Sequence, residues 1–102
     1  MTLGFDEKVF VLEMDRLREE QFLKQLNAYE EQIAPMMRQQ GYKRVDQVER
    51  RVIFTFGDIT FSRSRWRKGA KTRYPVDEWL ELKPCMRYSL ELLLQLAKLA
   101  SN

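Results

Sequence analysis

The fold is decided in the middle of the chain, where residues 50–65 read RRVIFTFGDITFSRSR. Apolar and polar residues alternate on both sides of Gly57-Asp58, and a period of two is typical of a β-strand with one buried face. A glycine followed by an aspartate between two such runs predicts a two-residue hairpin turn. The stretch is therefore predicted to form an antiparallel hairpin with strands at 50–56 and 59–65.

A turn at residues 57 and 58 also predicts which side chains lie opposite each other. Phe54 is expected to face Phe61, and Val52 to face Arg63, on one side of the ribbon. That side carries most of the apolar residues, so we expect it to pack on the core. A further turn at residues 68–70 is expected to return a short third strand at residues 71–74.

The residues before the hairpin show a helical pattern instead. Apolar side chains recur three or four positions apart, which predicts a long amphipathic helix over residues 6–40. Gly41 is well placed to end this helix in a left-handed conformation. Pro35 lacks a backbone N–H, so we expect it to kink the helix or to divide it near Ala34.

The residues after the third strand are predicted to form a short turn or helix around Trp79 and then a final helix with Ser89 as its N-cap. We expect Trp79 in the core, and Trp66 as well, although Trp66 could instead stack on a base. Residues 90–100 are apolar apart from a narrow polar stripe. Such a helix is expected to pack on a second copy of the chain or on a further domain.

These elements predict one α+β domain over residues 1–102, because a chain of this length has room for a single hydrophobic core. Its order is a long N-terminal helix, an antiparallel β-hairpin with a short third strand, and a C-terminal helix. The helical segment is placed at residues 6–41 and the basic β-ribbon at 43–74. The turn and the apolar C-terminal helix follow at 76–102.

Two residue types limit the chemistry of the chain, which contains no histidine and a single cysteine, Cys85. Without histidine, the Ser-His and Cys-His nucleophiles and the commonest metal ligand are absent. One thiol forms neither a disulfide framework nor a metal site. The chain is therefore expected to be non-catalytic by itself, with no cofactor, no metal and no small-molecule substrate.

The sequence also carries expectations about location. No segment reaches the roughly 20 apolar residues that a membrane span needs, and the N-terminus lacks the basic leader and apolar run of a signal peptide. A lone cysteine suits a reducing compartment. We expect a cytoplasmic protein with no membrane partner.

Charge is the most informative part of the composition. The whole chain carries +3, yet residues 43–73 contain 10 basic and 3 acidic residues, a net charge of +7. The flanking segments, 1–42 and 74–102, carry −3 and −1. Positive charge on a β-ribbon suits contact with a phosphate backbone, and the alternative is a solvated strand face. The candidate nucleic-acid contacts are Arg51, Arg63, Arg65, Arg67, Lys68, Lys71 and Arg73.

Two of these candidates have a competing interpretation. Arg63 and Arg65 continue the apolar face of the hairpin, so one of them could instead pair with a helix carboxylate such as Glu19 or Glu20. The helix at 6–40 has an acidic exposed face, which favours pairing with another helix over contact with DNA. Its alternative role is to lie on the sheet of its own chain.

The hairpin and its neighbours resemble the N-terminal region of the ISLre type of bacterial insertion-sequence transposase. The resemblance is carried by RVIFTFGDITFSR at 51–63, RWR at 65–67, YPVDEWL at 74–80 and RYSLE at 87–91. It covers roughly residues 5–100. Two features depart from the family pattern: the expected leucine-glycine pair reads Leu80-Glu81 here, and the region that carries the acidic residues of DNA cleavage in that family is absent.

The resemblance implies a DNA-binding or assembly module that serves transposition or DNA recombination, and it implies no catalytic residue in this chain. Duplex DNA is the expected partner, together with a homodimer formed through the apolar helices. One alternative is a protein-interaction module that makes no nucleic-acid contact. Another is binding to structured RNA, which would use the same basic ribbon.

Overall fold

A computed structural model of the chain describes residues 4–100 and has the predicted α+β class. One three-stranded antiparallel sheet, with the strand order β1-β2-β3, is accompanied by helices. Residues 1–3 and 101–102, at the ends of the predicted domain, lie outside the described range. The elements are α1 (Glu7–Gln39), β1 (Lys43–Phe54), β2 (Gly57–Lys68), β3 (Lys71–Arg73), α2 (Pro75–Trp79) and α3 (Leu90–Ala100).

Both ends of α1 are capped, and the C-terminal cap is the one that the sequence predicts. The carboxylate of Asp6 accepts a hydrogen bond from the backbone N–H of Val9 at 3.1 Å, which is an N-cap contact. At the other end Gly41 has a φ of 91°, and the N–H of Tyr42 donates to the carbonyl of Met37 at 2.9 Å. This is the Schellman arrangement, and it confirms Gly41 as the residue that ends the helix.

Pro35 does not divide α1, because the helix is continuous from Glu7 to Gln39, so of the two predicted effects the division does not occur. The proline lies in the last turns of the helix and its side chain is exposed. The neighbouring Ala34 and Met37 are buried against Trp66. Packing on that indole holds the final turns in place and offsets the hydrogen bond that proline removes.

The hairpin turn lies two residues earlier than predicted, and both predicted cross-strand pairs are wrong. Thr55 and Phe56 form the turn, and Gly57 follows it with a φ of 147°, a conformation that favours glycine. The partner of Phe54 is displaced by four positions, from Phe61 to Gly57. Because four is even, each face of the ribbon keeps the side chains predicted for it. The observed pairs include Phe54 with Gly57, Val52 with Ile59 and Arg50 with Phe61.

The third strand confirms the prediction of a second turn. Lys68 pairs with Lys71, and Gly69 between them has a φ of 58°. After α2 the chain turns again on Glu81, a non-glycine residue with a φ of 57°. The N–H of Leu82 donates there to the carbonyl of Asp77 at 2.8 Å. Glu81 thus occupies a glycine-type cap position, at the place where the resemblance predicts a glycine.

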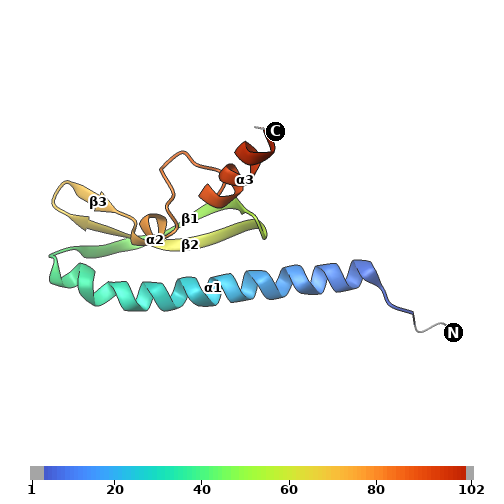
Figure 1. Cartoon of the computed structure of the whole chain (residues 1–102). Helices are drawn as coiled ribbons and strands as arrows, with labels where there is room; N and C mark the ends of the chain where they lie inside the picture. The colour runs from blue at the N-terminus through green and yellow to red at the C-terminus, as the bar shows by residue number, and fades with distance from the viewer. Residues whose placement is uncertain (1–3, 101–102) are drawn as a thin grey trace.

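Each long side of the hairpin is attached to another part of the chain at one point. On β2 the carboxylate of Glu30 accepts hydrogen bonds from the N–H of Ser64 at 2.8 Å and from its hydroxyl at 2.5 Å. On β1 the N–H of Ile53 donates to the carbonyl of Arg87 at 2.8 Å, and its carbonyl accepts from the N–H of Ser89 at 2.9 Å. Figure 1 accordingly shows α1 and α3 on opposite sides of the hairpin.

Two apolar clusters form the core. Trp66 is fully buried in the smaller cluster, as predicted. Trp79 is not a core residue, contrary to the prediction, because it is 38% exposed and stacks on Tyr29 with 4.6 Å between the ring centroids. The larger cluster consists of Leu26, Val52, Phe54, Ile59, Phe61, Val76 and Leu82.

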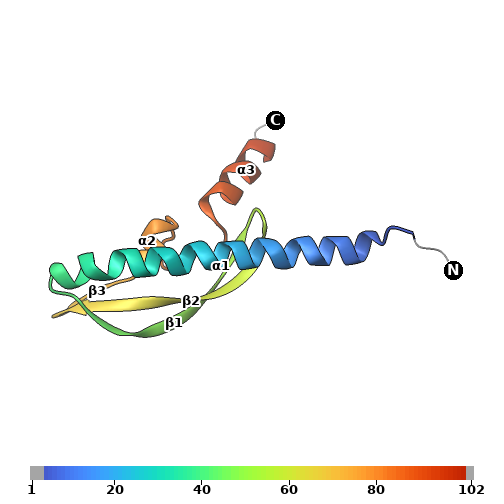
Figure 2. The same ribbon diagram turned by 90° about the horizontal axis from the view of Figure 1, so that it is seen from below.

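Two helical segments remain outside this core. The 33 residues of α1 span about 50 Å, whereas the 12-residue hairpin strands span about 40 Å. Figure 2 shows the N-terminal part of α1 running past the hairpin tip, and its side chains Val9, Phe10 and Leu12 are exposed. No residue of α3 is buried. Within residues 4–100, no helix combines the length and the apolar character needed to cross a membrane.

Candidate nucleic-acid interface

The arginines of the ribbon divide into those that hold a carboxylate and those that do not. Five of them form ion pairs, and two of the four carboxylates involved, Asp46 and Asp58, belong to the neighbouring strand of the hairpin. This division decides which cations are available to an external anion. The ion pairs are Arg50 and Arg63 with Asp77, Arg51 with Asp58, Arg65 with Asp46, and Arg73 with Glu78.

Asp77 sits at the centre of a buried network between α2 and the sheet. Arg63 donates to both of its carboxylate oxygens at 3.1 Å, and Arg50 donates to one of them at 2.9 Å. The three side chains are 9–10% exposed. Arg63 also donates to the carbonyl of Val48 at 2.8 Å and lies 4.5 Å from the ring centroid of Tyr74. The guanidinium of Arg63 is therefore fully engaged inside the protein.

Arg50 extends this network to the segment that leads into α3. Its second terminal nitrogen donates to the carbonyl of Lys83 at 2.6 Å and to that of Met86 at 2.9 Å. The sequence points to Arg63 or Arg65 as a partner for a helix carboxylate, with Glu19 or Glu20 as examples. For Arg63 the carboxylate does belong to a helix, but to α2 rather than to α1.

Arg65 pairs within the sheet, with Asp46 on β1. Its Nε donates at 2.9 Å and its Nη2 at 2.5 Å, so the contact is bidentate. Arg65 is 30% exposed and Asp46 is 43% exposed. Glu20, one of the proposed partners, instead accepts from Arg16 on its own helix at 2.6 Å.

Two further arginines form ion pairs at the surface. Arg51 holds Asp58 beside the hairpin turn, and the hydrogen bonds from its guanidinium keep the pKa of the Asp58 carboxyl below its ordinary value. Arg73 donates to Glu78 at 2.7 Å and also contacts the side-chain oxygen of Gln40 at 3.2 Å. Such exposed pairs are weak, because water screens both charges.

The remaining cations gather at one end of the sheet. There the C-terminus of α1, the start of β1, the end of β2 and the start of β3 meet, on the left of Figure 1. None of these cations has a carboxylate partner among residues 4–100. We call this surface the basic end, and it consists of Arg38, Lys43, Arg44, Arg67, Lys68 and Lys71.

Like charges face each other across the strands of the basic end. Lys43 of β1 is the direct cross-strand partner of Arg67, and Lys68 is the partner of Lys71. Like charges in this position destabilise a sheet. The side chains of Lys43, Arg67 and Lys71 make no hydrogen bond, ion pair or ring contact within residues 4–100. The sheet thus carries a local repulsion that its own residues leave uncompensated.

The other three cations are fixed in place without being neutralised. Lys68 donates to the backbone carbonyl of Gln40 at 2.8 Å, at the C-terminus of α1. The guanidinium carbons of Arg38 and Arg44 lie 5.8 and 5.2 Å from the ring centroid of the buried Trp66. These contacts orient the side chains, and their positive charge remains available to an anion.

The structure brings together three of the seven residues predicted as nucleic-acid contacts, namely Arg67, Lys68 and Lys71. The other four hold carboxylates. Sequence reasoning missed three members of the basic end. Lys43 and Arg44 are among the 10 basic residues of segment 43–73, and this is the only signal that the sequence gives for them. Arg38 lies outside that segment, in the last turn of the helix before Gly41. The four paired candidates are Arg51, Arg63, Arg65 and Arg73.

Other ligands find little support in the geometry. Among residues 4–100, no three His, Cys, Asp or Glu side chains gather as metal ligands would. Comparison of the chain with family models, with curated proteins and with solved structures gives no match.

Proposed function

We propose that this chain is the nucleic-acid-binding module of a transposase-like protein, non-catalytic by itself, and that the basic end contacts the phosphate backbone of duplex DNA. The observation that carries the proposal is the direct pairing of Lys43 with Arg67, with no carboxylate partner for either among residues 4–100. A phosphate placed between such cations replaces their repulsion with attraction and releases bound counterions from the DNA.

The contrast with the rest of the ribbon supports this assignment. Where an arginine of the ribbon serves the fold, the chain supplies a carboxylate for it, as Asp77 does for Arg63. The basic end lacks such carboxylates although it lies in the same sheet. An evolved partner outside the chain is the simplest source of the missing negative charge, and a nucleic acid offers it at regular spacing.

The sequence resemblance selects the kind of nucleic acid. The hairpin and the segments at 74–80 and 87–91 resemble the front end of ISLre-type transposases, whose substrate is duplex DNA. The basic end offers lysines and arginines at a sheet terminus rather than a helix shaped for the major groove. We therefore propose contacts with the backbone, which position a protein on DNA without reading its sequence.

Fluorescence anisotropy with a labelled DNA duplex at about 50 and 200 mM salt tests the proposal. The wild-type chain is expected to bind at the lower salt concentration and to lose most of its affinity at the higher one. A variant of the basic end, K43Q/R67Q/K71Q, is expected to bind weakly and to show a shallower dependence on salt. A structured RNA added as competitor distinguishes the two nucleic acids.

The matched control removes the same charge elsewhere, in the variant K8Q/K24Q/K83Q. These three lysines are exposed and lie outside the basic end. If both variants lose equal affinity, net charge governs the binding and the basic end is not a specific surface. If the wild-type chain binds no DNA at either salt concentration, the proposal fails.

A second candidate function has its own observation. The eleven residues of α3 include no buried side chain, and five of its leucines are between 39% and 72% exposed. A helix of this composition is stable in water only when another surface covers it. A protein-interaction module that makes no nucleic-acid contact would explain α3 and would leave the basic end without a role.

A further inference from the structure

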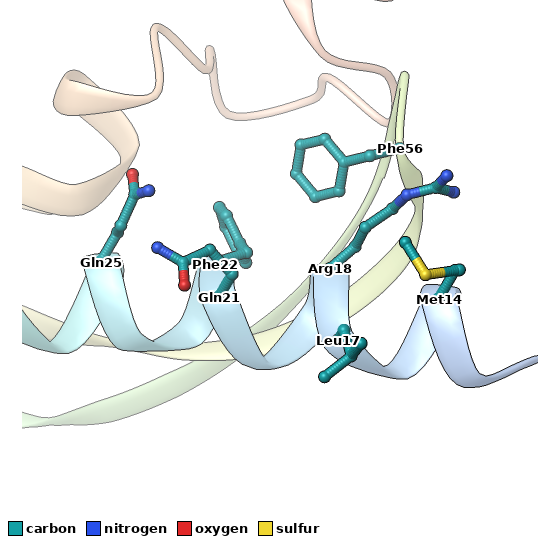
Figure 3. Close-up of a pocket in the computed structure, with 7 residues that line it drawn as sticks. All are labelled: Met14, Leu17, Arg18, Gln21, Phe22, Gln25 and Phe56. Carbon is teal, nitrogen blue, oxygen red and sulfur yellow. The ribbon is translucent and has the colours of Figure 1, made fainter.

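The chain carries an open apolar groove between α1 and the tip of the hairpin. Figure 3 shows the ring of Phe56 reaching from the hairpin toward Phe22 and Arg18 of the helix. The rings of Phe56 and Phe22 are 5.6 Å apart between centroids. Farther along α1, Met14 and Leu17 also line the groove, and Leu17 is 44% exposed. The floor is apolar, and polar groups stand at its rim.

The chain also carries an apolar helix that matches such a groove. In α3, Leu92, Leu96 and Leu99 follow one another at helical spacing and form a stripe along one side. Leu96 is 50% exposed and Leu99 is 72% exposed. Residues spaced by four and then three positions are the anchors by which an amphipathic helix lies in a groove.

The groove and the helix cannot meet within one chain. Glu30 fixes α1 along β2 through Ser64, and the hydrogen bonds of Ile53 fix the start of α3 along β1. The hairpin lies between them, as Figure 1 shows. The N–H of Leu93 donates to the carbonyl of Ser89 at 3.0 Å, so α3 begins at the point where the segment is attached to β1.

We infer that α3 of one copy occupies the groove of a second copy, and that the exchange is reciprocal, giving a two-fold symmetric dimer. Each copy supplies one helix and one groove, so a single arrangement covers both exposed surfaces twice. A two-fold interface is self-complementary, and a chain that carries both halves of a contact satisfies that requirement without another protein.

Charge at the rim of the groove complements charge on the helix. Arg18 stands at this rim, and its bond to Asp15 is long, at 3.3 Å. The first turn of α3 carries Glu91, on its narrow polar stripe. Placing Glu91 beside Arg18 of the other copy pairs opposite charges at the point where α3 enters the groove.

Sedimentation equilibrium of the full chain tests the inference, with L17E in the groove and L96E on the helix as the disrupting variants. The wild-type chain is expected to be a dimer, and each variant to raise the dimer dissociation constant at least tenfold. Both side chains are already exposed, so circular dichroism should show unchanged folding. The control variant Q32E on α1 adds the same charge at an exposed polar position outside the groove and should leave the dimer intact.

A charge exchange tests whether Glu91 of one copy lies beside Arg18 of the other. R18E and E91R should each weaken the dimer several-fold, and the double variant R18E/E91R should recover most of the wild-type affinity. A wild-type chain that stays monomeric at about 100 µM overturns the inference, because even a dimer with a weak dissociation constant should form at that concentration. Dimers lost in L96E but kept in L17E would also overturn it, because α3 would then contact something other than the groove.

This inference does not depend on DNA binding. The groove lies at the hairpin tip, and the basic end lies at the opposite end of the strands. Anisotropy of K43Q/R67Q/K71Q reports on the basic end alone, and sedimentation of L17E and L96E reports on the dimer alone. Either result can fail while the other holds.

Discussion

Arg63 and Arg67 lie four residues apart on the same face of β2, yet they differ in every respect that matters for function. Arg63 is 7% exposed and hydrogen-bonded to Asp77. Arg67 is exposed and faces Lys43. The same residue type in one strand therefore serves the fold at one position and is left to solvent at the other. The arginines and lysines of a basic strand therefore have to be separated into those that hold a carboxylate and those that do not, before any of them is assigned to a ligand.

The largest expected effect comes from removing the buried carboxylate. Asp77→Asn leaves Arg50 and Arg63 buried without a counter-charge, and the free energy of unfolding should fall by about 3–5 kcal/mol. Urea denaturation monitored by circular dichroism measures the change. Asp58→Asn removes a surface carboxylate and serves as the control. Equal losses in the two variants would contradict the distinction between buried and exposed arginine pairs.

A substitution at Glu81, in the cap that follows α2, should change the free energy of unfolding by a smaller amount and should raise it. Glu81→Gly removes a left-handed non-glycine residue from the turn that positions Asp77, and it should raise the free energy of unfolding by about 0.5–1 kcal/mol. Thermal unfolding measures it. Glu81→Ala keeps the unfavourable backbone conformation and should not stabilise the protein. A gain in the alanine variant would assign the effect to charge instead.

The basic end should respond to charge removal in the opposite way from Arg63. Lys43→Gln relieves the repulsion with Arg67, so the free energy of unfolding should stay constant or rise by a few tenths of a kcal/mol. Chemical denaturation at low salt measures it, with Lys24→Gln as the control. A clear loss of stability would show that Lys43 serves the fold, and the contrast between the two ends of β2 would disappear.

Arg65 is intermediate between the buried Arg63 and the exposed Arg67, so its ion pair with Asp46 tests the comparison more sharply. Asp46→Asn should cost less than about 1 kcal/mol of stability, because both side chains are partly exposed. It also releases Arg65 on the face that carries Arg67. Duplex DNA affinity measured by anisotropy should then rise slightly. A fall in affinity would mean that Arg65 must be held by Asp46 in order to contact DNA.

The smallest effect is a change of pKa. Hydrogen bonds from Arg51 lower the pKa of Asp58, so this pair contributes stability above the ordinary aspartate pKa and loses it as the pH falls through the lowered value. The window lies below about pH 4. Arg51→Gln should return the pKa of Asp58 toward its ordinary value, measured by carboxyl-carbon NMR titration. An unchanged titration would remove Arg51 as the cause.

The sequence predicted the elements well because their signals are local. The helix end at Gly41, the turn at Gly69 and the N-cap Ser89 each depend on neighbouring residues alone. The position of the hairpin turn was wrong because Gly57 also suits the residue that follows a turn. In the observed register Phe54 and Phe56 both pack against Phe22, a long-range contact that the local sequence does not reveal.

The candidate site was harder to predict because ion pairing is a long-range property. Asp77 lies 14 residues from Arg63 and 27 from Arg50, and nothing in the local sequence connects them. Charge counting located the basic segment correctly, but it gave Arg63 and Arg67 the same weight. The position of Trp79 was mistaken for a similar reason, since Tyr29 covers one of its faces while the rest of α1 leaves it open to solvent.

The carboxylate of Glu30 has a consequence for how the protein behaves at high concentration. An uncovered strand presents a row of donors and acceptors to any other chain, which is how misassembled sheets and amyloid-like fibres grow. The carboxylate of Glu30 accepts from the backbone N–H of Ser64 on β2, and residues 87–89 hydrogen-bond the backbone N–H and carbonyl of Ile53 on β1. These contacts, together with the pairing of β3 at the end of β2, shorten the stretch of open strand that another chain could pair with.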